Sequence, residues 1–170
     1  MPTKSGRPVF AHVCLLVEDI QTAIADYQKV LEVIDPDQAA EYQFGENAEV
    51  GGDAYHVATF FNPIGGCEIQ FMQPLSGPLL KRLEKRGEHV HHLAFASDDL
   101  EGMVEEVKER GIGVTSDELM NDSKNMPFQN WTFVNPKWTH GVLLELIRPY
   151  KTVNGQWISA DEDVAAEAEL

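Results

Sequence analysis

The sequence predicts an α+β fold in which two βαβββ modules pair to form a cupped mixed sheet with the helices outside. Two observations support this prediction. Segments 12–20 and 92–100 both begin with a histidine, continue as an apolar run of strand length, and end in an acidic pair before a helical pattern. Segments 70–74 and 145–149 both read polar, apolar, apolar, polar, proline. Because both motifs recur in the same order, we infer that one ancestral module was duplicated.

Each module is expected to open with a strand followed by a helix. Apolar residues three and four positions apart predict one helix from Ile20 and another from Leu100. At the start of the second helix, Asp98 and Glu101 have the spacing of a capping box. Gly111 stands where the C-terminal cap of this helix belongs.

The domain organisation follows from these repeats. The first module is expected over residues 8–74 and the second over residues 89–149. Residues 75–88 are expected to link them through a short helix that ends before Gly87. Residues 150–170 are rich in Asp, Glu and Ala towards their end, and we predict that they form a flexible, exposed tail in which only Trp157 and Ile158 could dock onto the domain.

Composition argues against several classes of protein. The chain has 13 basic and 28 acidic residues, a net charge of −15, so a nucleic-acid-binding surface is not expected. No apolar run approaches the roughly 18 residues that span a bilayer, and the polar N-terminus does not resemble a secretory signal. Two cysteines, Cys14 and Cys67, do not make a disulfide framework. We therefore expect a reduced, cytoplasmic protein with no membrane partner.

Four strands each place one potential metal ligand on the face opposite the helices. Side chains alternate along a strand, and the helix-facing positions are apolar in all four. The opposite faces carry His12, Gln70, His92 and Glu145. A carboxylate such as Glu145 inside an apolar strand is costly unless it is paired or coordinated. Two imidazoles, an amide oxygen and a carboxylate suit divalent Mn, Fe, Co, Ni or Zn, with two octahedral positions left for water or a chelating substrate.

Each of these residues also has a purely structural interpretation. A single histidine at the start of a strand is usually structural, and Glu145 alone could be an ion-pair partner. Their matched positions in the repeat favour the metal site. Cys14 shares the face of His12 and is interpreted as a packing residue, whereas His91 is expected to face away from the site.

At these residues the sequence resembles the vicinal oxygen chelate superfamily, which includes glyoxalases, bleomycin resistance proteins and dioxygenases. The resemblance covers about residues 8–149. Within it, residues 79–95 resemble the linker helix and second metal strand of the methylmalonyl-CoA epimerase family, and residues 133–137 with 141–146 resemble its closing hairpin. The resemblance implies the glyoxalase fold and places the family's metal ligands on the same four residues.

The resemblance implies a metal-dependent isomerase that acts through a metal-chelated enolate. An acyl-CoA thioester, the substrate of the epimerases, would chelate the metal while two groups move its α-proton. In the family one of the two is the ligating glutamate, here Glu145. The aligned stretch 53–58 shows no carboxylate where the other is expected, so His56 and Glu68 become candidates. Residues 121–131 also depart from the family pattern, being longer and more aromatic, and could reshape the pocket.

Other functions stay open. A glyoxalase-type lactoylglutathione lyase could use the same cup. A ring-cleaving dioxygenase is less favoured because oxygen chemistry prefers three protein ligands and Gln70 supplies a fourth. The presence of four ligands argues against a metal-free binding protein.

The resemblance also implies a homodimer. A basic cluster could bind the phosphates of coenzyme A or be an ordinary solvated surface: Lys81, Arg82, Lys85, Arg86 and Lys137.

Overall fold

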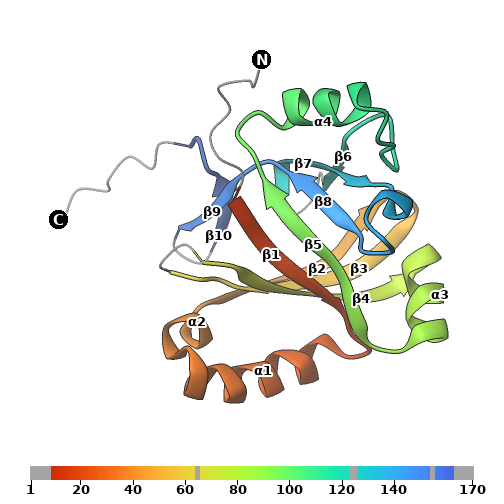
Figure 1. Cartoon of the computed structure of the whole chain (residues 1–170). Helices are drawn as coiled ribbons and strands as arrows, with labels where there is room; N and C mark the ends of the chain where they lie inside the picture. Colours follow the sequence, from red (N-terminus) through yellow and green to blue (C-terminus); the bar gives the residue numbers. More distant parts are fainter. Residues whose placement is uncertain (1–8, 64–65, 123–125, 154–155, 163–170) are drawn as a thin grey trace.

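Eight strands form one mixed sheet that curves into a nearly closed barrel (Figure 1). The computed structural model describes residues 9–63, 66–122, 126–153 and 156–162. The strands are β1 (Val9–Leu16), β2 (Tyr42–Val50), β3 (Asp53–Phe60), β4 (Glu68–Ser76), β5 (His89–Ala96), β6 (Met120–Asp122), β7 (Met126–Val134) and β8 (Leu144–Ile147). Their order in the sheet is β2-β3-β4-β1-β5-β8-β7-β6.

The sheet order is the same in both halves when each is read from its outer edge. The first half runs β2-β3-β4-β1 and the second runs β6-β7-β8-β5. Strand β1 lies parallel to β4, β5 lies parallel to β8, and β1 meets β5 antiparallel in the middle of the sheet. This arrangement of paired βαβββ units confirms the predicted fold class.

Side-chain caps mark where the helices after β1 and β5 begin. The helices are α1 (Ile20–Ile34), α2 (Pro36–Ala40), α3 (Gly77–Arg86) and α4 (Leu100–Glu109), with a 3₁₀ turn, η1 (Pro136–Trp138). Asp19 caps α1. The cap of α4 is Asp99, not the predicted Asp98, because Ser97 Oγ accepts the Asp99 N–H and the Asp99 carboxylate then accepts from Gly102 N. Within the described ranges, no helix is long and apolar enough to cross a membrane.

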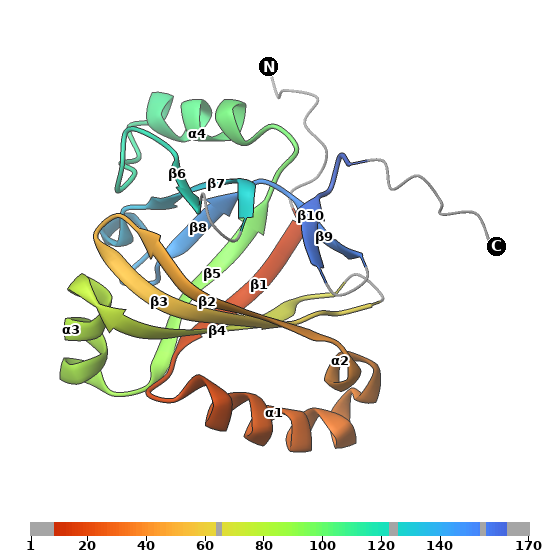
Figure 2. The same cartoon turned by 180° about the vertical axis from the view of Figure 1, so that it is seen from behind.

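Helices α1 and α4 cover the outer faces of the two halves of the sheet and leave its inner face for the site (Figures 1 and 2). Helix α1 buries Ile20, Ile24 and Leu31 in a cluster that includes Phe60 and Phe71 of the sheet. Helix α4 is packed in the same way on the second half. Each fully buried side chain of this size contributes about 1.5–3 kcal/mol, so these contacts stabilise the packing of α1 and α4 on the outer face of the sheet.

Residues 150–159 form a hairpin, and the predicted flexible tail is wrong for this segment. Strands β9 (Tyr150–Val153) and β10 (Gln156–Ser159) pair antiparallel. Trp157 is only 6% exposed and packs edge-on against Phe61. Burial of this large ring outweighs the polar composition of the segment as a whole. Residues 163–170 lie outside the described part of the chain.

Candidate metal centre

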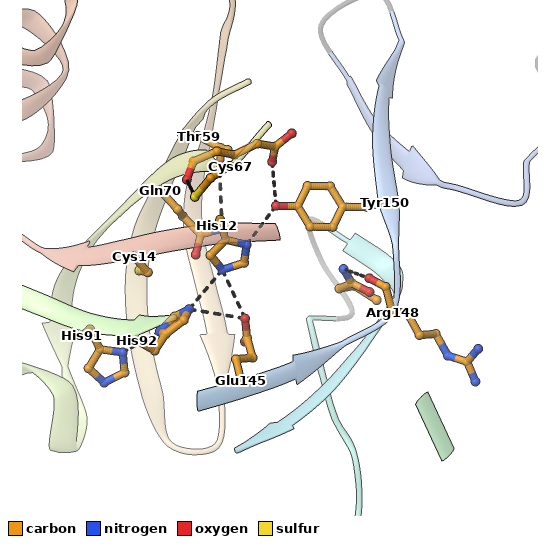
Figure 3. Close-up of polar contacts among 12 residues, drawn as sticks. His12, Cys14, Thr59, Cys67, Gln70, His91, His92, Glu145, Arg148 and Tyr150 are labelled. Atoms are coloured by element: carbon orange, nitrogen blue, oxygen red, sulfur yellow. Dashed lines mark hydrogen bonds and ion pairs between the residues drawn. The ribbon is translucent and has the colours of Figure 1, made fainter. Parts of the chain in front are cut away.

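The four predicted metal ligands lie on four neighbouring strands, β4, β1, β5 and β8, and line one cavity on the concave side of the sheet. The strand register aligns them in two rows, His12–Ala94–Glu145 and Gln70–Cys14–His92. Ala94 and Cys14, the middle residues of the two rows, are small and fully buried. Small side chains at these positions let the larger ones converge, as Figure 3 shows for both histidines and the glutamate.

Three donor atoms meet in a nearly equilateral triangle. His12 Nε2 lies 3.1 Å from His92 Nε2 and 3.2 Å from Glu145 Oε2, and His92 Nε2 lies 3.3 Å from the same oxygen. Ligand atoms held about 2.0–2.2 Å from one ion lie roughly 2.8–3.1 Å apart in an octahedral shell and roughly 3.3–3.6 Å apart in a tetrahedral one. The observed distances run from the top of the octahedral range to the bottom of the tetrahedral one, so the three atoms have the spacing of ligands to one small divalent ion.

The carboxylate of Glu145 is buried, and its Oε2 faces both histidine rings. Its side chain is 6% exposed, and among the described residues Oε2 has no hydrogen bond of good geometry although both rings are close. Burial by itself raises the pKa of Glu145. The neighbouring His92 and then His12 outweigh this and hold the pKa well below its usual range. A buried, ionised oxygen facing two imidazole nitrogens is the pattern expected of a cation site.

Gln70 adds an amide group to the same cavity. Its side chain is buried, and Nε2 donates to Thr59 Oγ1 at 3.4 Å. With the nitrogen used as donor, the oxygen on the other side of the amide remains available as a ligand. The predicted set is thus brought to one cavity, with three of its members in direct mutual contact.

Both histidines are held at their second ring nitrogen. His12 Nδ1 lies 3.0 Å from the hydroxyl of Tyr150, which donates to Glu68 Oε2 at 2.7 Å (Figure 3). Burial raises the pKa of Glu68 to about 7, even though Tyr150 and His12 act in the opposite direction. Glu68, a candidate acid/base, lies behind His12 in this chain of contacts and lines a separate cavity. Sequence reasoning missed Tyr150 because it lies in the segment expected to be a tail.

His92 has its partner in His91. The two Nδ1 atoms lie 2.8 Å apart, and His91 lines the main cavity. The expectation that His91 faces away from the site is therefore wrong. Burial, together with the charge of His92, lowers the pKa of His91 to about 3, so this ring is neutral and can accept the His92 Nδ1–H. That bond would leave the Nε2 lone pair of His92 facing the triangle.

The rest of the cavity lining is mostly apolar but includes two further carboxylates. The apolar part of the lining comes mainly from Tyr55, Met72, Met120, Met126, Trp131 and Phe133. Asp53 and Asp122 also line it. Asp53 lies on β3, and one of its oxygens accepts from Leu79 N at 2.8 Å at the start of α3. Sequence reasoning found no carboxylate of residues 53–58 at the position expected for the second acid/base, and it gave Asp122 no role because residues 121–131 depart from the family pattern.

The structure does not bring His56 to this cavity. Strand β3 turns Asp53, Tyr55 and Val57 inward, and alternation directs His56 to the other face. There its Nδ1 accepts from Asn47 N at 3.2 Å and its ring lies against Phe44. Cys14 is a packing residue and not a metal ligand, because it lies in the inner apolar cluster and burial raises the pKa of its thiol.

Comparison with known proteins identifies a superfamily for the chain. A model of the glyoxalase/bleomycin resistance protein/dioxygenase superfamily matches residues 11–129. The chain belongs to this superfamily. The matched range contains His12, Gln70 and His92, and Glu145 lies beyond it.

Proteins similar to the chain include methylmalonyl-CoA epimerases. An uncharacterised protein of Bacillus subtilis, YqjC, is 26% identical over 140 residues, covering 81% of this chain and 90% of the relative. Human mitochondrial methylmalonyl-CoA epimerase is 26% identical over 138 residues, covering 79% and 70%. The crystal structure of methylmalonyl-CoA epimerase from Mycobacterium tuberculosis superimposes with a TM-score of 0.65 at 25% identity, covering 88% and 93%. These similarities support the glyoxalase fold and an enzyme of the superfamily.

Proposed function

We propose that the chain is a metal-dependent epimerase or isomerase that moves a proton α to a carbonyl, with methylmalonyl-CoA or a similar carboxyacyl thioester as substrate. The observation that carries this proposal is the buried triangle of His12, His92 and Glu145, with donor atoms 3.1–3.3 Å apart. Similarity to methylmalonyl-CoA epimerases points to the same reaction.

A divalent ion fits the residues that are present. His12, His92 and Glu145 would hold it, with the amide oxygen of Gln70 as fourth ligand, and this donor set suits Mn, Fe, Co, Ni or Zn. When bound, such an ion polarises a carbonyl and stabilises the negative charge of an enolate. The neutral rings and one carboxylate leave the loaded centre with a net positive charge that favours an anionic transition state.

Proton transfer requires groups on two sides of the reacting carbon. Glu145 supplies one carboxylate at the centre itself. Asp53 and Asp122 are the other carboxylates among the described lining residues of the cavity. We propose that one of these two, rather than His56, returns the proton, because a general acid must reach the substrate within hydrogen-bond distance. The apolar lining limits water near the enolate and so protects it from unselective protonation.

The basic residues of α3 could bind the phosphates of an acyl-CoA substrate. Leu79 of this helix lines the cavity, so α3 forms part of its rim. Lys81, Arg82, Lys85 and Arg86 of the same helix are exposed. These side chains offer the positive charge that the phosphates of an acyl-CoA need on an otherwise acidic protein.

Deuterium wash-in tests this function. The metal-loaded protein is incubated with methylmalonyl-CoA in D₂O, and exchange at the α-carbon is followed by NMR together with loss of optical activity. We expect both deuterium exchange and loss of optical activity, and we expect a metal chelator to abolish both. Absence of exchange at high enzyme concentration would refute the epimerase, and turnover of a glutathione hemithioacetal by the same preparation would assign the lyase reaction instead.

A further inference from the structure

We infer that Tyr150 is a positioning residue of the metal centre. Its hydroxyl links Glu68 to His12 and fixes the His12 ring with the Nε2 lone pair towards His92 and Glu145. This inference rests on the proposed metal centre and extends it to the C-terminal hairpin, which lies outside both predicted modules.

Counting hydrogens gives the direction of each bond. A tyrosine hydroxyl carries one hydrogen, and when Glu68 is ionised that hydrogen is donated to Glu68 Oε2 at 2.7 Å. The contact between the same hydroxyl and His12 Nδ1, at 3.0 Å, must then use the hydrogen on Nδ1. A neutral imidazole with its hydrogen on Nδ1 has its lone pair on Nε2, and Nε2 is the atom in the triangle.

The other tautomer would work against metal binding. With a hydrogen on Nε2, His12 could donate to Glu145 Oε2, 3.2 Å away, and close the triangle as a hydrogen-bonded pair. That pair would have to break before an ion could bind. Metal-ligating histidines are commonly oriented by an outer acceptor that holds their second N–H. In this chain a tyrosine hydroxyl is that acceptor, and Glu68 orients the hydroxyl.

Three separate elements hold this chain of contacts together. His12 of β1 and Glu68 of β4 are direct strand partners. Tyr150 opens β9 and packs against apolar clusters of both halves of the sheet. The hairpin is anchored by Trp157 of β10, so the position of the hydroxyl depends on a segment that follows the second module.

Replacing Tyr150 by phenylalanine tests the inference without removing the ring. Co²⁺ binding to the metal-free protein is measured by isothermal titration calorimetry for wild type, Tyr150→Phe and the control Tyr42→Phe, whose ring lies on the exposed strand β2. We expect Tyr150→Phe to weaken Co²⁺ binding about 10–100-fold, the usual effect of losing an outer partner. The control should bind as wild type does. Equal affinity of Tyr150→Phe and wild type would overturn the inference.

The tautomer gives a readout that does not require metal. In ¹⁵N-histidine NMR of the metal-free protein, we expect His12 to carry its hydrogen on Nδ1 in wild type and to lose this preference in Tyr150→Phe. An Nε2–H ring in wild type, or an unchanged ring in the variant, would overturn the inference. A wild-type protein that shows the Nδ1–H ring and binds no Co²⁺ would refute the metal centre but support the hydrogen-bond assignment. Thermal midpoints identify a variant that is merely unfolded.

Discussion

Trp157 of β10 lies edge-on against Phe61, with ring centroids 6.0 Å apart, and this contact docks the C-terminal hairpin against the barrel. Trp157 is 6% exposed, whereas Trp138 of η1 is 48% exposed. Trp157→Ala is therefore expected to lower the free energy of unfolding by about 3–5 kcal/mol. Trp138→Ala serves as the matched control and should stay within about 0.5 kcal/mol of wild type. Urea unfolding measures both, and similar small effects would show that the hairpin is not docked.

The histidines give a second matched comparison. His92→Ala removes one corner of the triangle, and Glu145→Gln removes its charge while keeping its size. Both are expected to lose bound metal and turnover together, because a divalent ion then lacks a ligand or its compensating carboxylate. His56→Ala removes a histidine that faces the outside of β3 and should keep both. Metal content by mass spectrometry with parallel α-proton exchange is the measurement, and a metal-free but active Glu145→Gln protein would contradict the site.

The two cavity carboxylates can be separated by isosteric change. Asp53→Asn and Asp122→Asn each remove one candidate acid/base, and the variant that removes the true one should slow epimerisation by about 10²–10⁴-fold. In that variant, the α-proton of one stereoisomer should still exchange with solvent, since Glu145 can still remove and return the proton on its own side of the α-carbon. Asp117→Asn on the exposed surface is the control. If both cavity variants epimerise at the wild-type rate, neither carboxylate moves the proton.

Asp19 makes stability depend on pH at the start of α1. Its carboxylate accepts from Thr22 N at 2.6 Å, and this hydrogen bond lowers the pKa of Asp19 below the ordinary 3.8. The folded-state pKa lies below the unfolded one, so the stabilisation is fully present above about pH 3.8 and is lost as the pH falls through the folded value. Asp19→Ala should lower the thermal midpoint at pH 7, and its difference from wild type should shrink in acid. A constant difference would argue against a charged cap.

Most of the fold could be predicted from the internal repeat of the sequence. Strand alternation around His12, Gln70, His92 and Glu145 was enough to assign their inward face, because each outer face is continuously apolar. The distances within the triangle could not be predicted, since they depend on the register of β1 with β5 and of β5 with β8. Register is set by pairing across the whole sheet and leaves little local signal.

Residues outside the repeat were predicted less well. His56 was favoured as an acid/base by residue type, but its position on β3 places it on the opposite face from Tyr55 and Val57. Tyr150 was hidden by the acidic composition of the C-terminal segment, although Trp157 a few residues later signals a buried stretch. His91 was assigned outward by alternation, yet β5 pairs with β1 through a register shift that relaxes strict alternation beside His92.

Anomalous scattering from crystals of the Co²⁺-loaded protein would locate the metal directly. We expect one strong cobalt peak bonded to His12 Nε2, His92 Nε2 and Glu145 Oε2, with the oxygen of Gln70 completing the protein ligands. Cobalt bound only to surface carboxylates, or no peak between these side chains at saturating Co²⁺, would contradict the proposed metal centre.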